Sequence, residues 1–331
     1  MNERLINELY GLKVEQALFG DKFTAAGYTF WLFHHETCSE EEAQERYAMA
    51  NHQHEQGEKG VWIPIQNRQG SFLSMIEGKK ICLLGLGSTG EQNIHELYGK
   101  KLAQFHGRGL RLKTNLDKAN MLGQWKEFWE RRIDQLEQFW MEKCMFNPRN
   151  EFETIFVKVF PYYMGMTENA IQFLVDTEMD DQPQQIDRGT ICFERYGGAG
   201  DSGNAGKNPF YWVWDHPSRD LAEWVRNKYF MNPNTYHYEI RQFLNEYVQE
   251  MRPSLFSLRL LYARLLLPLH FFDTIEMFYL AGSEGEKKRL EDKLAVDVKN
   301  APQYEHFLRN FWNAIEMPAV RQRIRLPEWL Q

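Results

Sequence analysis

The stretch of sequence that decides the fold is residues 190–222, TICFERYGGAGDSGNAGKNPFYWVWDHPSRDLA. Two runs rich in aromatic and β-branched residues, 190–196 and 210–214, flank a glycine-rich segment, 197–206. Such runs are typical of short β-strands, and the glycines between them predict a loop. A helix is expected to begin at Ser218 and to carry the closing Asp-Leu-Ala. We therefore predict a hairpin-like β-unit inserted among helices.

The residues before this stretch predict a small α/β lobe. A strand is expected at 27–33, followed by a helix that a Ser39–Glu42 capping box begins and that runs to about residue 57. Three more strands are expected, the first two forming a hairpin through a turn at 67–70. Their expected ranges are 61–66, 71–76 and 80–84.

From residue 91 onward, apolar residues recur every three to four positions and predict helices. We expect helices over 94–105, over 122–140 and over 167–178, the last with Thr167 as its N-cap. Further helices are expected to begin near 218, 236 and 253, and two more after 283. The most apolar window, 260–272, is interrupted by Arg264, Pro268 and His270 and is too short to cross a bilayer, so we expect a buried core helix. The prediction is an α+β chain with a lobe at 1–90 and a larger helical lobe at 91–331.

Composition excludes several classes of function. The 331 residues are 43% hydrophobic and 15% aromatic, which suffices for a large packed core. Lys and Arg number 39 against 46 Asp and Glu, a net charge of −7, so neither nucleic acid nor anionic lipid is an expected partner. Four widely spaced cysteines without a CxxC pair predict free thiols in a reducing compartment. The first residues lack the apolar core of a signal peptide, so we expect synthesis in the cytoplasm without one.

Two motifs suggest chemistry that their context does not support. Residues 85–90, GLGSTG, match a dinucleotide-binding loop, but no second strand ending in an acidic residue follows about twenty residues later. A dinucleotide enzyme would also need a parallel sheet, which the sequence does not predict. His52 and His54 lie two positions apart on a predicted helix and point to different faces, which argues against a zinc site. No metal site is predicted.

The order of elements resembles the aminoglycoside-phosphotransferase-like kinases. Residues 97–106, LYGKKLAQFH, resemble the helix that follows the connector between the lobes in that superfamily. More closely, the chain resembles the spore-coat kinase-like proteins of endospore-forming bacilli, the CotS-like group, and within it the YutH-type endospore coat-associated proteins. Thr190-Ile-Cys192 and residues 215–224, DHPSRDLAEW, carry this match. The resemblance implies a bilobal protein-kinase-like fold, a location at the spore coat or developing spore surface, and other coat proteins as partners.

The same resemblance shows where this sequence departs from a working kinase. Phosphoryl transfer needs a strand lysine paired with a helix glutamate, a catalytic-loop aspartate and a metal-binding aspartate. The strand at 28–33 contains no lysine, and Trp31 and Phe33 stand in it instead. Glu45, or Glu42, on the following helix is therefore left without the expected lysine partner.

The catalytic loop departs further. Placed on the family pattern, Phe193 replaces the loop histidine, Arg195 replaces the aspartate, and Val213 replaces the metal-binding aspartate. Arginine cannot accept a proton at neutral pH. Asp215 fits a metal role only if the alignment shifts by two residues, and Asp220 matches the aspartate that braces the loop backbone.

The loop's magnesium-binding asparagine would fall at Gly200, with Asn204 the nearest candidate. From these departures we expect a catalytically degenerate kinase-like protein that needs neither ATP nor magnesium and acts in coat assembly through protein contacts. The alternative is a small-molecule phosphotransferase, an ATP-dependent kinase with Asp215 as metal ligand and Glu194 or Asp201 as an unconventional base.

Overall fold

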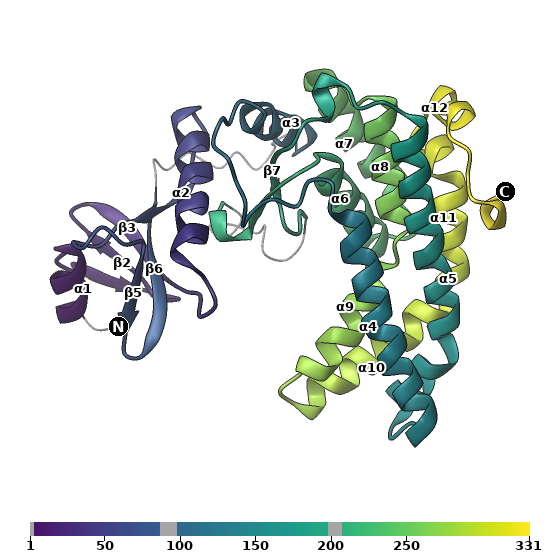
Figure 1. Ribbon diagram of the computed structural model, residues 1–331, viewed down its shortest axis with the longest axis horizontal. Helices are drawn as coiled ribbons and strands as arrows, with labels where there is room; N and C mark the ends of the chain where they lie inside the picture. Colours follow the sequence, from purple (N-terminus) through teal and green to yellow (C-terminus); the bar gives the residue numbers. More distant parts are fainter. Residues whose placement is uncertain (1–2, 87–97, 198–206) are drawn as a thin grey trace. The chain divides into compact units, whose positions relative to one another are not determined.

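A computed structural model describes residues 3–86, 98–197 and 207–331 (Figure 1). The chain divides into two compact units. The first comprises Met1–Leu122, Arg188–Asn227 and Gln242–Arg252, and the second comprises Gly123–Asp187, Lys228–Arg241 and Pro253–Gln331. The predicted lobe boundary between residues 90 and 91 lies outside the described residues.

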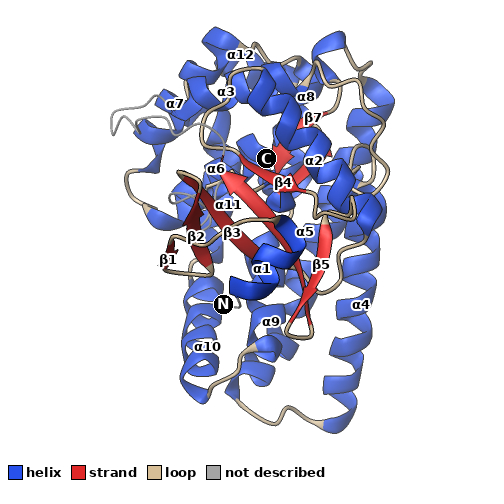
Figure 2. Ribbon diagram, turned by 90° about the vertical axis from the view of Figure 1, so that its left-hand side faces the viewer, coloured by secondary structure: helices blue, strands red, loops and turns tan. Residues whose placement is uncertain are grey.

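The first unit is built on an antiparallel sheet of six described strands (Figure 2). Its order is β1-β2-β3-β6-β4, and β5 also pairs with β6. The elements are α1 (Glu3–Tyr10), β1 (Gln16–Leu18), β2 (Lys22–Ala25), β3 (Tyr28–His34), α2 (Glu40–Glu55), β4 (Trp62–Ile65), β5 (Leu73–Ile76) and β6 (Lys79–Leu86). The predicted strand at 27–33 is β3, and the predicted helix after Ser39 is α2, whose first turn Ser39 caps through a hydrogen bond from the Glu42 N–H.

Each face of this sheet has its own apolar layer. Ile6 of α1 packs with Phe23, Phe30 and Leu83 on one face. Ala43, on α2, packs on the opposite face with a second group of side chains. These are Phe33, Cys38, Trp62, Phe72, Cys82, Leu84 and Phe210. Figure 1 shows α1 and α2 on opposite sides of the sheet. The alternation of Phe30, Trp31, Leu32 and Phe33 along β3 supplies both layers, as expected for a strand covered on both faces.

The expected hairpin between 61–66 and 71–76 is wrong. The turn at Asn67 exists, because the Gly70 N–H bonds to the Asn67 carbonyl and the Asn67 side chain accepts the N–H groups of Gln69 and Ser71. The strands on either side do not pair with each other. Instead β4 pairs with the second half of β6 and β5 with its first half, so both lie along one edge of the same long strand.

A second, two-stranded sheet forms as predicted from the runs at 190–196 and 210–214. β7 (Thr190–Phe193) pairs antiparallel with β8 (Trp212–Asp215), with Cys192 opposite Val213. Helix α3 (Tyr98–Gly109) lies against β7, and α6 (Ser218–Met231) follows β8 directly. Residues 198–206 of the predicted loop lie outside the described residues.

The second unit is helical. Its helices are α4 (Trp125–Phe146), α5 (Glu151–Asp180), α8 (Leu255–Leu266), α9 (Leu269–Leu280), α10 (Glu284–Lys299), α11 (Ala301–Ala314) and α12 (Pro318–Arg323), while α6 and α7 (Tyr236–Glu250) contribute residues to both units. Short 3₁₀ turns occur at Gln185–Asp187, Pro209–Tyr211 and Glu328–Leu330.

Two of the expected helices have different limits. Thr167 is not an N-cap, because α5 begins sixteen residues earlier behind the Asn150 cap, and the Thr167 hydroxyl bonds to the Tyr163 carbonyl inside the helix. The window 260–272 is buried but is not one helix, since the chain breaks at Leu267 and Pro268 between α8 and α9. Across the described ranges no single helix is long and apolar enough to cross a membrane. Only α8 and α9 taken together meet that test, and they are bent by 44°.

Candidate functional site

The β7–β8 unit is held tightly against α3. A Cβ atom at Gly109 would clash with Thr190 Oγ1 and lie 2.7 Å from the Ile191 backbone nitrogen, so only glycine permits this approach. The Thr190 hydroxyl donates to the His106 carbonyl at 2.7 Å. α3 therefore fixes the start of β7 and, through it, the segment that follows.

Asp220, on the first turn of α6, holds the end of β7. Its two carboxylate oxygens lie 3.1 and 3.0 Å from the backbone nitrogen of Phe193, which donates to them. His106 Nε2 lies 3.0 Å from the same carboxylate, and Nδ1 lies 2.8 Å from the Tyr247 hydroxyl. Burial raises the pKa of Asp220, while the hydrogen bonds from His106 and Phe193 act in the opposite direction. The arrangement is a buried brace of the loop backbone by Asp220, with its acceptors directed into the protein.

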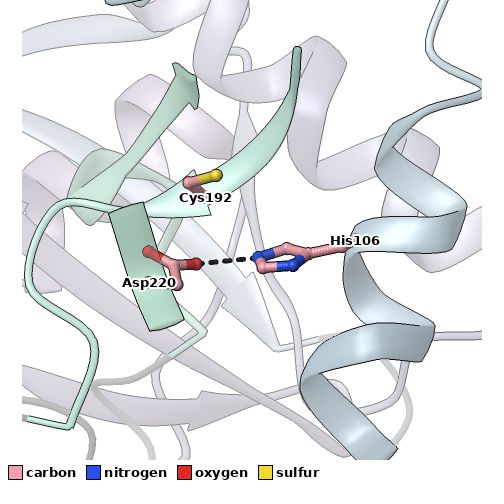
Figure 3. Close-up of side chains that lie close together, drawn as sticks. All are labelled: His106, Cys192 and Asp220. Atoms are coloured by element: carbon pink, nitrogen blue, oxygen red, sulfur yellow. Dashed lines mark hydrogen bonds and ion pairs between the residues drawn. The ribbon is translucent and has the colours of Figure 1, made fainter. Parts of the chain in front are cut away.

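Cys192 completes a compact group with these two residues. In the ranges 3–86, 98–197 and 207–331, His106, Cys192 and Asp220 are the one set of three potential metal ligands whose donor atoms all lie within 4.8 Å of one another (Figure 3). All three side chains are fully buried. The Cys192 thiol lies 3.5 Å from the carbonyl oxygens of Asp215 and His216, so each donor atom has a protein partner. Hydrogen bonding within the protein accounts for this group.

Asp215 is buried as completely as Asp220, and its charge is balanced by an ion pair with Arg219. Its carboxylate accepts the His216 backbone N–H at 2.7 Å and the Arg219 Nε at 2.7 Å. Although burial alone lowers the pKa of Arg219, the neighbouring Asp215 raises it, so the ion pair is favoured. Arg219 also donates to the Glu194 carbonyl, which ties α6 to the residue after β7.

The three positions at which the sequence is predicted to depart from a kinase, Phe193, Arg195 and Val213, differ in exposure. Phe193 is buried and stacks on Phe105 with 4.9 Å between ring centroids, and Val213 is buried in β8. The Arg195 side chain is 43% exposed and lies 3.6 Å from Glu223. Glu223 also accepts from Arg226 at 3.0 Å. Two positions are thus apolar and buried, while the third carries a cation.

Glu42 and Glu45 of α2 are bound by an arginine and by backbone N–H groups, not by a lysine. Both carboxylate oxygens of Glu45 accept backbone N–H groups, from Asp117 and Lys118 on one side and from Ala119 on the other. Glu42 pairs with Arg46 at 3.0 Å, and Arg46 in turn donates to the Trp212 carbonyl. α2 is therefore tied to the β7–β8 unit through backbone groups.

The sheet face that carries Trp31 and Phe33 is filled with aromatic rings. Phe210, from the segment before β8, stacks on Phe33. Trp31 meets Trp62 edge to face at 5.6 Å. A lysine does lie on this face, but it comes from β2: Lys22 stands opposite Trp31 in the strand register, and its ammonium lies 5.0 Å from the Trp31 ring centroid.

Sequence reasoning missed His106, Tyr247, Phe210 and Lys22. His106 is separated from Asp220 by more than a hundred residues, and a histidine on an apolar helical face has no local signal that names its partner. Lys22 was missed because β2 was not predicted. Asp201 and Asn204 lie outside the described residues.

The comparisons with known proteins agree with this architecture. The family described as "Spore coat putative kinase YutH" matches residues 3–311. The chain belongs to this spore coat family. It is 36% identical to the endospore coat-associated protein YutH of Bacillus subtilis (strain 168) over 332 residues, covering 98% of this chain and 97% of that protein.

Solved structures show that this YutH-family chain has a kinase-like fold. An aminoglycoside phosphotransferase from Alicyclobacillus acidocaldarius subsp. acidocaldarius DSM 446 matches with a TM-score of 0.63 at 13% identity, over 98% of this chain and 96% of that one. Spectinomycin phosphotransferase APH(9)-Ia, solved with ADP and spectinomycin, matches with a TM-score of 0.53 at 13% identity, over 97% and 98% of the two chains. The predicted α+β kinase-like fold and the family resemblance are confirmed.

Proposed function

We propose that this protein is a catalytically inactive, kinase-like component of the bacterial endospore coat that acts in coat assembly through contacts with other coat proteins. Membership of the spore coat family and the kinase-like fold support the association with the coat. The observation that carries the inactive assignment is that Asp215 and Asp220, the two aspartates of the β8–α6 segment, are buried and bound by protein donors.

A phosphotransferase needs carboxylates that face the substrate and metal. Neutralising the charge of the transferred phosphoryl group depends on metal-binding aspartates and on a base that accepts a hydroxyl proton. Asp215 and Asp220 direct their oxygens into the protein, and Arg195 stands where the base is expected. An arginine there adds positive charge but cannot act as a base.

The lysine–glutamate clamp is also replaced. Glu45 and Glu42 bind backbone amides and Arg46, and Phe210 stacks on the sheet face where a kinase holds its nucleotide. Separating these groups would leave the amide of the buried residue Ala119 without its acceptor, at a cost of about 1–3 kcal/mol. The contacts of Glu42 and Glu45 thus hold α2 in place, which supports a structural role over a catalytic one.

The test of inactivity is direct. Purified protein is titrated with ATP and magnesium by calorimetry, and ADP release is followed with and without candidate acceptors, using an aminoglycoside phosphotransferase as positive control. We expect no magnesium-dependent ATP binding and no ADP release above a protein-free blank. Tight magnesium-dependent binding with phosphate transfer would overturn the proposal.

The coat assignment has its own test. A tagged copy is followed by microscopy through sporulation and is expected to gather at the developing spore surface. Uniform distribution in vegetative cells would contradict a coat role whatever the chemistry of the site.

A second candidate function is an ATP-dependent kinase with an unconventional site. Lys22 favours it, because this lysine lies on the sheet face beside Trp31 and Trp62 and could contact a phosphate. The titration with ATP and magnesium distinguishes the two candidate functions. If the protein is a kinase of this kind, the unmodified protein binds ATP and Lys22→Gln abolishes that binding.

A further inference from the structure

Large apolar side chains are exposed where the end of α4 lies beside the end of α9. Ring contacts join these ends: Phe139 meets Tyr279 edge to face with 5.0 Å between centroids, and Phe152, on the first turn of α5, stacks on Phe278 at 3.7 Å. Around these contacts, several apolar side chains remain open to solvent, and we call them the apolar end. They are Met141, Met145, Phe146, Met277, Tyr279 and Leu280.

The apolar end exposes a large area to water. Met145, Phe146 and Leu280 are 76%, 72% and 83% exposed. Because a fully exposed side chain of this size presents roughly 150–200 Å², the six members together leave about 600 Å² in contact with water. Exposed apolar area of this extent commonly marks a place where a protein associates with another molecule.

The size of the apolar end suits a second copy of this chain. Burying the apolar ends of two copies against each other would remove about 1,200 Å² from water, which exceeds the roughly 1,000 Å² that a specific interface needs. Three of the six members are methionines, whose unbranched side chains adapt their shape to the surface they meet. Such a surface can pack against its own copy.

Two charges of opposite sign flank Met145 and Phe146 in the sequence. Glu142 lies near the end of α4, and Arg149 lies in the turn between α4 and α5. Both residues are exposed, and neither forms an ion pair within the part of the chain that the structure describes. In a two-fold dimer, contacts between two copies are reciprocal. Glu142 of each copy can therefore pair with Arg149 of the other, so the charges beside the apolar end complement a second copy.

We propose that the apolar end forms a two-fold interface between two copies of this chain. Its apolar side chains exchange contact with water for contact with each other, and Glu142 and Arg149 fix the register at the rim. The inference goes beyond the proposed function, because such a dimer forms whether or not the protein is catalytically active.

The test measures the oligomeric state of the full chain by sedimentation equilibrium, with a reducing agent present because Cys144 is an exposed thiol. We expect a dimer with a dissociation constant of about 1–100 μM. Leu280→Glu places a charge inside the interface and should weaken dimerisation by about tenfold or more. Phe19→Glu is the matched control, since Phe19 is 99% exposed in the first unit, and it should change the dissociation constant by less than about twofold.

The rim charges are tested by exchanging them. Glu142→Arg sets like charges against each other twice in a two-fold interface and should weaken dimerisation about tenfold. Glu142→Arg/Arg149→Glu restores opposite signs with their positions exchanged, so it should recover a dissociation constant within about threefold of that of the unmodified protein. A double variant as weak as the single one would show that these residues do not meet across a two-fold axis and would overturn the proposal.

Other results would also overturn it. One is a chain that stays monomeric up to about 100 μM, and another is an equal loss in Leu280→Glu and Phe19→Glu. A monomer that floats with vesicles of neutral phosphatidylcholine would show that the apolar end contacts a membrane instead. Urea titration verifies that each variant is folded. The assay contains no ATP or magnesium, so its outcome and that of the test of catalytic inactivity are independent.

Discussion

The ring of Phe210 stacks on the ring of Phe33 with 5.1 Å between their centroids and 27° between their planes. Phe33 belongs to β3 of the six-stranded sheet, and Phe210 belongs to the segment that leads into β8. This pair therefore joins the six-stranded sheet to the β7–β8 unit. Both rings are buried, so the contact is part of the core of the first unit.

Phe210→Ala should destabilise the protein strongly. Removing a buried phenyl ring costs about 3–5 kcal/mol of unfolding free energy, because the ring's burial is lost and a cavity remains. Urea unfolding followed by tryptophan fluorescence measures the change. Phe19→Ala is the matched control, since Phe19 is 99% exposed and its loss should change stability by less than about 0.5 kcal/mol. Equal effects of the two substitutions would show that the Phe33–Phe210 contact contributes nothing.

Asp220→Asn should lower stability without altering side-chain size. An amide offers one acceptor in place of two and brings donors that have no acceptor in the brace, at an expected loss of about 2–4 kcal/mol. The Phe193 amide proton should then exchange faster with solvent, which hydrogen exchange detects. Asp292→Asn, in an exposed pair with Lys288, is the control and should be nearly neutral. Unchanged protection of the Phe193 amide would contradict the brace.

Arg195→Asp restores the residue type that the kinase pattern expects. We expect no ATP turnover from it, because Val213 still stands at the metal position and Glu45 remains bound to backbone amides. The new carboxylate would face Glu223, so stability should fall by about 0.5–1 kcal/mol. Arg195→Gln is the control and should lose less stability. Magnesium-dependent turnover by Arg195→Asp would show that this one substitution suppresses an otherwise intact site.

The parts of the fold that follow from sequence are those with strong local signals. The aromatic run of β3 and the Ser39 cap of α2 depend only on neighbouring residues, and both were predicted. β1 was not predicted because its three residues are all exposed and show no apolar alternation. β2 does alternate, but it has only four residues, which is a short run for a strand signal. The pairing of β4 and β5 with β6 was missed for a different reason, since a turn signal fixes where the chain reverses but not which strand becomes the partner.

For the site as well, the sequence indicated residues that are near one another in the chain but not the contacts between distant residues. The sequence placed Phe193, Arg195 and Asp220 on one segment by analogy with a family pattern. It gave no means of finding that His106 meets Asp220, because a buried histidine and its carboxylate can lie on any two packed elements. Glu58 likewise joins Arg108 of α3 to Lys207, nearly a hundred residues later, and only the folded chain brings these charges together.

The first turn of α5 provides a prediction of pH dependence. Glu153 accepts the Arg149 N–H at 2.7 Å and contacts Lys143 at 2.9 Å and the Tyr279 hydroxyl at 3.1 Å. Burial alone would raise the pKa of Glu153, but these three partners hold it below its ordinary value of 4.5. The folded protein therefore binds this proton less readily than the unfolded chain. The resulting stabilisation is complete above about pH 5 and is lost as the pH falls through the lowered pKa.

Glu153→Gln should accordingly lower the free energy of unfolding by about 1–3 kcal/mol at pH 7. The difference from the unmodified protein should stay constant down to about pH 5 and shrink as the pH falls below 4.5. Denaturant titrations between pH 7 and pH 3 measure it. Glu151→Gln changes an exposed glutamate in the same helical turn and should be close to neutral across this range. A Glu153→Gln deficit that persists unchanged at pH 3 would mean that the charge of this carboxylate does not stabilise the start of α5.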